Sequence, residues 1–296
     1  PAEEESMHTQ GVPEWVPTRD GRQLYAMVLP GPADGVGRPT VVFEAGAAAT
    51  RSSWALVQPL VGEYARAIVY DRAGLGRSVR DAAGRTLDRM ADDLNDLLDH
   101  FGPGPFVLVG HSAGGPIVRL AASRRLERVA GLVLVDPTDE AADVLFSRVF
   151  RVGEEVLIFV NGTLARLGLL ERAFGFVLDG APADVREDLH REAFTPALVA
   201  TQAEQARTYL DELRAWRQAP PDLGDIPVTI ISGGLAKGWD GMPARVRAAA
   251  NASHAFRVAQ HRGGRHVVAE RSGHYVPLTE PEVIADEIRR LVSPAR

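Results

Sequence analysis

A serine flanked by glycines is the first feature of the sequence that could do chemistry. Ser112 lies in VLVGHSAGG, where a β-favouring run ends and a helix-like segment begins. Gly110 and Gly114 stand two residues to either side, and a Cβ at those positions would collide with the crossing strand or helix. The pattern predicts an exposed hydroxyl on a sharp turn, with the backbone N–H of Ala113 directed at whatever the serine attacks.

A serine hydroxyl is a weak nucleophile and needs a base. His274 is the candidate among the eight histidines, because it lies on a loop after the expected strand HVVAE. Open α/β sheets place their sites beyond the carboxyl ends of the strands. His266 would begin that strand and lie at the other end, and His111 is expected to point elsewhere on the turn. His274 is therefore the predicted base for Ser112.

A carboxylate is needed to orient the histidine, and two aspartates are candidates. Asp136 ends the expected strand in GLVLVDP, so no loop excursion is needed to bring it near His274. The strand in IPVTIIS is followed by GGLA, which holds no carboxylate, and Asp240 lies further on in KGWDG. We favour Asp136, keep Asp240 as the alternative acid and place Asp139 third.

Short runs rich in Val and Ile recur along the chain and are apolar on both faces, which favours buried parallel strands. A helix is predicted over 87–101 from apolar residues spaced by three and four, with Thr86 as its N-cap. Residues 12–30 are predicted to form a hairpin. This alternation predicts an α/β fold with a mostly parallel sheet covered by helices on both faces. The other expected strands are 40–44, 67–70, 106–109, 131–135, 227–231 and 266–269.

The alternation of strands and helices stops near Pro137 and resumes at Ile226. Between them, residues 138–225 have a mostly helical pattern rich in Phe and Leu. We therefore expect an α/β core formed by 12–137 and 226–296, with 138–225 as an inserted helical cap. Residues 1–11 are expected to form a disordered lead-in.

Together these motifs resemble the α/β-hydrolase superfamily over essentially the whole chain from about Val12. The resemblance rests on VVFEAG, YDRAGLGRS, VGHSAGG, LVLVDP and SGHYVPLTEPE, which occur in the family's order. It implies the α/β-hydrolase fold, a nucleophile elbow, an acid after a later strand and a histidine after the last strand.

The resemblance also implies a second donor for an oxyanion hole. This role falls on the backbone N–H of Ala47, with Gly46 helping to shape the loop. Ala45 replaces the family's usual histidine, which matters little for a backbone donor. Glu44 is either a buried structural carboxylate or a residue that tunes the site.

The residues and the resemblance imply a carboxylesterase-like serine hydrolase that forms an acyl-enzyme and uses no metal or cofactor. The Phe- and Leu-rich cap indicates that its partner is a small-molecule acyl substrate, a moderately apolar carboxylic ester. Thioesterase, lactonase, amidase and C–C bond hydrolase activities use the same triad and stay open. The alternative class is a non-catalytic ligand-binding protein of the same fold. Serine at the elbow argues against epoxide hydrolases and haloalkane dehalogenases, which use aspartate there.

Composition argues against several other roles. The net charge is −6 and the arginines are scattered, which gives no basic field for nucleic acid. No apolar run approaches the roughly 18 residues of a membrane span. The chain has no cysteine and so no disulfide or thiolate site. PAEEESMHTQ lacks the regions of a secretory signal, which favours a cytoplasmic over a secreted location, although trimming before Pro1 would hide such a signal. The sequence indicates no oligomeric state.

Overall fold

A computed structural model describes residues 6–293 and is built on one eight-stranded sheet. The strand order is β1-β2-β4-β3-β5-β6-β7-β8. The strands β1 and β2 form an antiparallel hairpin, β2 also pairs antiparallel with β4, and the remaining neighbours are parallel. The predicted mostly parallel sheet is confirmed. The strands are β1 Val12–Pro17, β2 Gln23–Leu29, β3 Thr40–Glu44, β4 Ala67–Tyr70, β5 Phe106–His111, β6 Val129–Val135, β7 Val228–Gly233 and β8 Arg265–Ala269.

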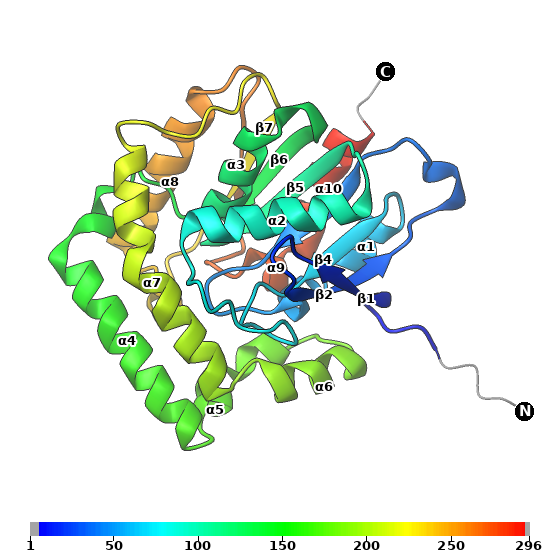
Figure 1. The fold of residues 1–296 in the computed structure, drawn as a ribbon. Coiled ribbons are helices and arrows are strands. Elements are labelled where there is room, and N and C mark those ends of the chain that lie inside the picture. Colours follow the sequence, from blue (N-terminus) through cyan, green and yellow to red (C-terminus); the bar gives the residue numbers. More distant parts are fainter. Residues whose placement is uncertain (1–5, 294–296) are drawn as a thin grey trace, which may run out of the picture.

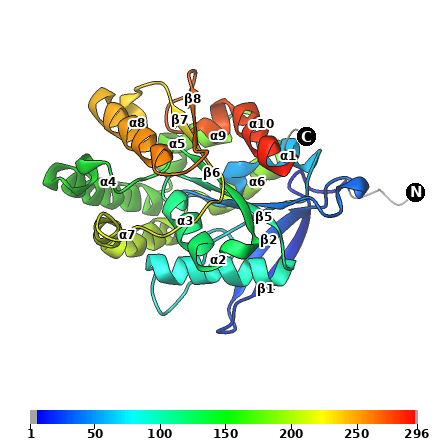
Figure 2. The same cartoon turned by 90° about the horizontal axis from the view of Figure 1, so that it is seen from above.

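Helices cover both faces of this sheet, as the alternation predicts (Figures 1 and 2). Apolar side chains of α2 and α3 pack on one face, and those of α1 and α10 pack on the other. Within β3, Val42 faces the first layer, whereas Val41 and Phe43 face the second, because successive strand residues point to opposite sides. The helices are α1 Gln58–Gly62, α2 Leu87–Phe101, α3 Gly114–Arg124, α4 Arg148–Arg166, α5 Leu170–Phe174, α6 Ala183–Glu192, α7 Pro196–Trp216, α8 Ala244–Ala259, α9 Val276–Thr279 and α10 Pro281–Val292.

Between β6 and β7 the chain leaves the sheet and forms α4, α5, α6 and α7 (Figure 1). This is the segment expected to form a cap, and we keep the name cap for residues 138–225. Two small apolar clusters pack it against the core, one around Leu75 and one around Ala55. The cap thereby lies over the loops that follow the strands. None of the helices within residues 6–293 combines the length and apolar composition that a membrane crossing requires.

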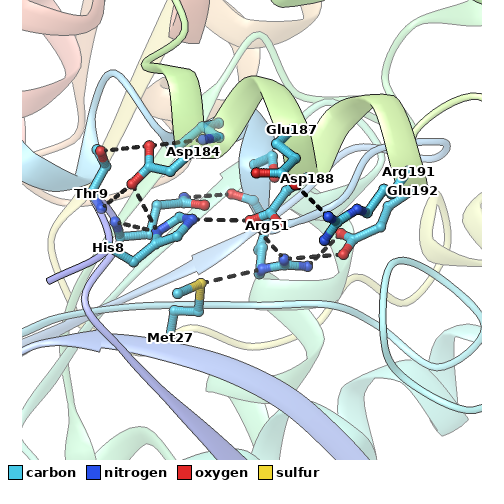
Figure 3. Close-up of polar contacts among 12 residues, drawn as sticks. His8, Thr9, Met27, Arg51, Asp184, Glu187, Asp188, Arg191 and Glu192 are labelled. Atoms are coloured by element: carbon cyan, nitrogen blue, oxygen red, sulfur yellow. Dashed lines mark hydrogen bonds and ion pairs between the residues drawn. The ribbon is translucent and has the colours of Figure 1, made fainter. Parts of the chain in front are cut away.

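The expectation of a disordered lead-in is wrong for the part of it that the structure describes. His8 Nε2 lies 3.0 Å from Asp188 Oδ2, and the Thr9 backbone N–H donates to Asp184 at 2.7 Å, both on α6 (Figure 3). Gln10 is fully buried. The order of this segment could not be predicted from its acidic composition, because its polar groups pair with carboxylates some 175 residues away. Residues 1–5 lie outside the described residues.

Arg51 connects the core to the cap next to the contacts of His8 and Thr9, and it is fully buried in the turn Arg51–Trp54 (Figure 3). Its guanidinium donates to Asp71 at 2.7 Å, and to two carboxylates of α6, Glu192 at 2.7 Å and Asp188 at 3.2 Å. A buried cation requires such partners. The contacts fix α6 against the core.

Candidate active site

Ser112 lies on the turn between β5 and α3, with a φ of 53° in the left-handed region that side chains rarely adopt. A Cβ on Gly110 would come within 2.6 Å of the Gly114 carbonyl oxygen. A Cβ on Gly114 would come within 2.6 Å of the Glu44 carbonyl oxygen. Both positions therefore require glycine. Gly46 differs, because its added Cβ would lie 3.6 Å from the nearest atoms, which is ordinary van der Waals contact.

A chain of hydrogen bonds connects the three predicted side chains. His274 Nε2 lies 3.0 Å from Ser112 Oγ, and His274 Nδ1 lies 2.6 Å from Asp136 Oδ2. Burial alone would raise the pKa of Asp136, but the hydrogen bonds from His274 and Arg247 outweigh it and hold the pKa below its ordinary value. Because an ionised carboxylate only accepts, the His274 proton lies on Nδ1, and Nε2 is left to accept from the serine hydroxyl.

The structure brings Asp136, and not Asp240, to the His274 ring. Asp136 follows β6 directly, with a φ of 41°. Asp240 Oδ2 instead accepts from the backbone N–H of His274 at 2.8 Å, so it holds the loop rather than the imidazole. Asp139 pairs with Arg257 at 2.9 Å. Sequence alone favours Asp136 but leaves Asp240 as an alternative, because a loop that folds back can bring Asp240 to the same sheet edge.

His111 has a contact that the sequence did not predict. Its Nε2 lies 2.8 Å from the His274 carbonyl oxygen, and the two ring centroids are 4.9 Å apart. Burial, reinforced by the nearby His274, lowers the pKa of His111 to about 3. A neutral His111 therefore supports the loop that carries His274.

Arg72 holds the loop after β3 by its carbonyl oxygens. Its guanidinium donates to Ala45 O at 2.5 Å and to Gly46 O at 2.7 Å. A trans peptide directs its N–H opposite to its C=O, so the N–H of Ala47 points away from Arg72. Ala47 itself lines the cavity described below.

Glu44 anchors that arginine. The Glu44 carboxylate is fully buried and accepts from Arg72 at 2.9 Å and from the hydroxyl of Tyr70. Burial raises the pKa of Glu44, and the charge of Arg72 opposes this rise. Of the two roles considered for Glu44, the contacts support a structural carboxylate behind the loop.

The N–H of Ala113 is oriented by the same geometric rule. The carbonyl oxygen of Ser112, which belongs to the same peptide, accepts from Gly115 N at 3.0 Å and Thr138 N at 3.1 Å. The Ala113 N–H points away from both donors. The cap helix α7 adds a contact here, because Tyr209 donates its hydroxyl proton to the Ala113 carbonyl at 2.9 Å.

A cavity of about 250 Å³ lies against Ser112 and His274, between core and cap. Its polar side chains include Asn161 on α4 and Gln202 on α7. A hollow of about 360 Å³ between α4 and α7 touches neither Ser112 nor His274. Within residues 6–293, no group of three His, Asp or Glu side chains is arranged to hold a metal ion. The apolar wall of the first cavity includes Leu157, Leu170, Phe174, Val177, Leu189 and Phe194.

Comparisons with known proteins agree with this fold. An AB hydrolase superfamily protein of Gibberella zeae is 27% identical over 93% of this chain and 92% of its own length. The magnesium-chelatase 30 kDa subunit of Rhodobacter capsulatus is 31% identical over 74% of this chain and 76% of its own. A solved esterase from Exiguobacterium antarcticum has a TM-score of 0.71 at 19% identity, over 95% of this chain and 99% of that one, a match that concerns the fold alone.

The family comparison covers most of the sequence. The model of the alpha/beta hydrolase family matches residues 41–287, a stretch that includes Ser112, Asp136 and His274. The chain therefore belongs to the alpha/beta hydrolase family.

Proposed function

We propose that the protein is a serine hydrolase that cleaves a small, moderately apolar carboxylic ester through an acyl-enzyme. Membership of the family supports hydrolase activity. The observation that carries the finer proposal is the hydrogen-bond chain from Ser112 through His274 to Asp136 at the wall of an apolar cavity. A neutral imidazole whose free nitrogen faces the hydroxyl can act as a general base.

In the first half of the reaction, Ser112 Oγ attacks the carbonyl carbon of the ester while His274 Nε2 takes the hydroxyl proton. The carbonyl electron pair moves to oxygen, and the N–H groups of Ala47 and Ala113 donate to the resulting oxyanion. The intermediate then expels the alkoxide, which leaves as an alcohol with the proton held by His274. Asp136 stabilises the imidazolium during this step.

In the second half, a water molecule attacks the acyl carbon and gives a proton to His274. The acyl–oxygen bond to Ser112 breaks, and the proton returns to the serine oxygen. The carboxylic acid leaves, and the enzyme is restored. The apolar cavity wall favours uncharged acyl groups of modest size, because burying a charge there would cost solvation that no partner replaces.

The test is covalent labelling with a fluorophosphonate, followed by peptide mass spectrometry. We expect the label on Ser112 and none on the Ser112→Ala protein. A panel of p-nitrophenyl esters, with a matched thioester, lactone and amide, then ranks the substrates, and short alkyl esters are expected to react fastest. Absence of labelling on the folded wild type would favour the ligand-binding alternative. Faster turnover of charged acyl groups would overturn the apolar substrate class.

A further inference from the structure

Arg247 on α8 is a buried cation in contact with the aspartate of the hydrogen-bond chain. Its Nη1 donates to Asp136 Oδ1 at 2.6 Å and its Nη2 donates to Asp136 Oδ2 at 3.1 Å. The two side chains are 6% and 0% exposed. This two-point geometry is the strong form of an arginine–carboxylate pair. Asp136 is thus shared between His274 and a permanent cation.

The surrounding chain is arranged to admit this guanidinium. Gly233 ends β7, and a Cβ there would lie 2.8 Å from Arg247 Nη2 and 2.2 Å from the Gly273 carbonyl oxygen. The Gly233 N–H donates to Asp136 Oδ1 at 3.1 Å. Asn251, one turn further along α8, accepts from Arg247 at 3.2 Å and donates to the Gly233 carbonyl at 2.9 Å. The arginine is therefore held on both sides.

The first consequence concerns orientation. The terminal torsion of an aspartate is broad, and the Gly233 N–H and His274 each contact only one oxygen of Asp136. The Arg247 fork occupies both oxygens of Asp136 and fixes the plane in which Oδ2 faces His274. Small displacements of an orienting group lower a reaction rate strongly, because catalysis depends on geometry.

The second consequence concerns charge. A carboxylate beside His274 stabilises the imidazolium, and a cation on the same carboxylate offsets part of that effect. The two aromatic rings next to His274 are neutral, since burial lowers the pKa of His111 to about 3 and raises that of Tyr275 to about 12. The titratable groups near the His274 ring include His111 and Tyr275, and those near its loop include Asp240 and Lys237. Those near Asp136 include His254 and Arg247.

We propose that Arg247 is a positioning residue for this reaction: it fixes the Asp136 carboxylate in the plane that His274 requires, and its charge offsets part of the attraction between that carboxylate and the imidazolium formed during the reaction. The inference rests on the proposed hydrolase function. No family motif identified in the sequence contains this arginine, and its role follows from the contacts of α8 alone.

The test compares pH profiles of kcat/KM for Arg247→Met, Arg247→Lys and the wild type. With the cation removed, Asp136 stabilises the imidazolium more fully, so the acidic limb of Arg247→Met is expected to move up by about one pH unit. We also expect kcat to fall about 10- to 100-fold from the loss of orientation, with KM little changed. Arg247→Lys keeps the charge but loses the two-point contact with Asp136. The acidic limb of its pH profile is therefore expected to stay in place while its kcat falls.

Arg257→Met is the matched control. Arg257 is also buried on α8 and pairs with Asp139 and Glu140, away from His274. This variant is expected to lose stability while keeping the wild-type limb and kcat. If Arg247→Met retains the wild-type profile, or if both variants change in the same way, the positioning role is overturned.

A readout independent of turnover separates this inference from the proposed function. Imidazole NMR spectra, assigned with His274→Gln, follow the protonation of His274 in Arg247→Met and the wild type. A higher titration midpoint in the variant supports the charge effect even if the protein hydrolyses no ester, and equal midpoints overturn it. Should circular dichroism find Arg247→Met unfolded, Arg247→Lys decides: an unchanged kcat overturns the orienting role, and a displaced acidic limb overturns the charge effect.

Discussion

His111, which precedes the proposed nucleophile Ser112, is a titratable side chain that the fold keeps neutral. Its ring is buried against Trp54 and His274, and its Nε2 faces the His274 carbonyl. The contact supports the loop of the predicted base without adding a charge near it. Protonation of this ring would place a cation in a space built for a neutral imidazole.

This burial predicts a loss of stability on acidification. The pKa of His111 falls from 6.5 in the unfolded chain to about 3 in the folded protein, so between these values the unfolded state binds more protons. Its contribution is fully present above pH 6.5 and declines as pH falls, by up to about 1.4 kcal/mol per pH unit. Thermal unfolding from pH 4 to 8 should show a shallower decline for His111→Gln than for the wild type. Parallel curves would contradict this assignment.

The sequence carried enough local information to place Ser112, His274 and the favoured acid. The glycine pattern at the elbow is a short-range steric requirement, and a strand end fixes Asp136 without a loop. Arg247 and His111 could not be found in the same way. Their partners lie 111 and 163 residues away in the chain, so their roles depend on how α8 and the His274 loop cross the sheet edge.

At the level of elements, the loop after β3, which carries the Ala47 N–H proposed as an oxyanion donor, is held by side chains from other parts of the chain. Arg72 donates to three successive carbonyl oxygens of this loop, the third at 3.5 Å. Glu44 accepts from Arg72, and α7 reaches the same arginine through Gln205 at 3.5 Å. The loop is therefore fixed by a charged side chain rather than by its own sequence. Its Ala45 and Ala47 offer no polar side chain for this purpose.

Arg72→Gln is expected to lower kcat about 10- to 100-fold with little change in KM, because a misdirected Ala47 N–H weakens binding of the oxyanion rather than of the substrate. Steady-state kinetics on a short-chain ester measures this. Arg128→Gln is the control, since Arg128 is also buried but lies just before β6, at the end of the strand opposite to the site, where it pairs with Asn95 and Asp99. A rise in KM with kcat intact would show that Arg72 serves substrate binding instead.

The elements themselves follow closely from local patterns, but some of their ends do not. The helix at 87–101 was predicted within its observed limits because Thr86 caps it and accepts from Arg89 N at 3.2 Å. Strand β5 runs on to His111, beyond the predicted end at 109, because Gly110 and His111 still pair with β6. Glycine at 110 indicates a turn when the sequence is considered alone. Pairing with a neighbour distant in sequence determines where the strand stops.

For the whole molecule, the junction between core and cap combines apolar packing with buried charge clusters, one of which surrounds Arg51. Arg51 of the core faces Asp188 and Glu192 of α6, whose side chains are 8% and 9% exposed. Leu189 of the same helix lines the cavity. The contacts between Arg51 and α6 should therefore influence both local opening of the cap and binding of substrate.

Asp188→Asn combined with Glu192→Gln removes two charges that face Arg51 while keeping the side-chain shapes. Weaker partners should lower the free energy of local opening of α6 by about 1–3 kcal/mol, because hydrogen bonds to charged groups are the stronger ones. Hydrogen exchange followed by mass spectrometry should then be faster in α6 and unchanged in β5 and β6, with a higher KM. Glu187→Gln is the control, because within residues 6–293 Glu187 pairs only with Arg191, on the exposed face of α6, a contact worth about 0.3–0.5 kcal/mol. Equal exchange in the two proteins would mean that apolar packing alone holds the cap.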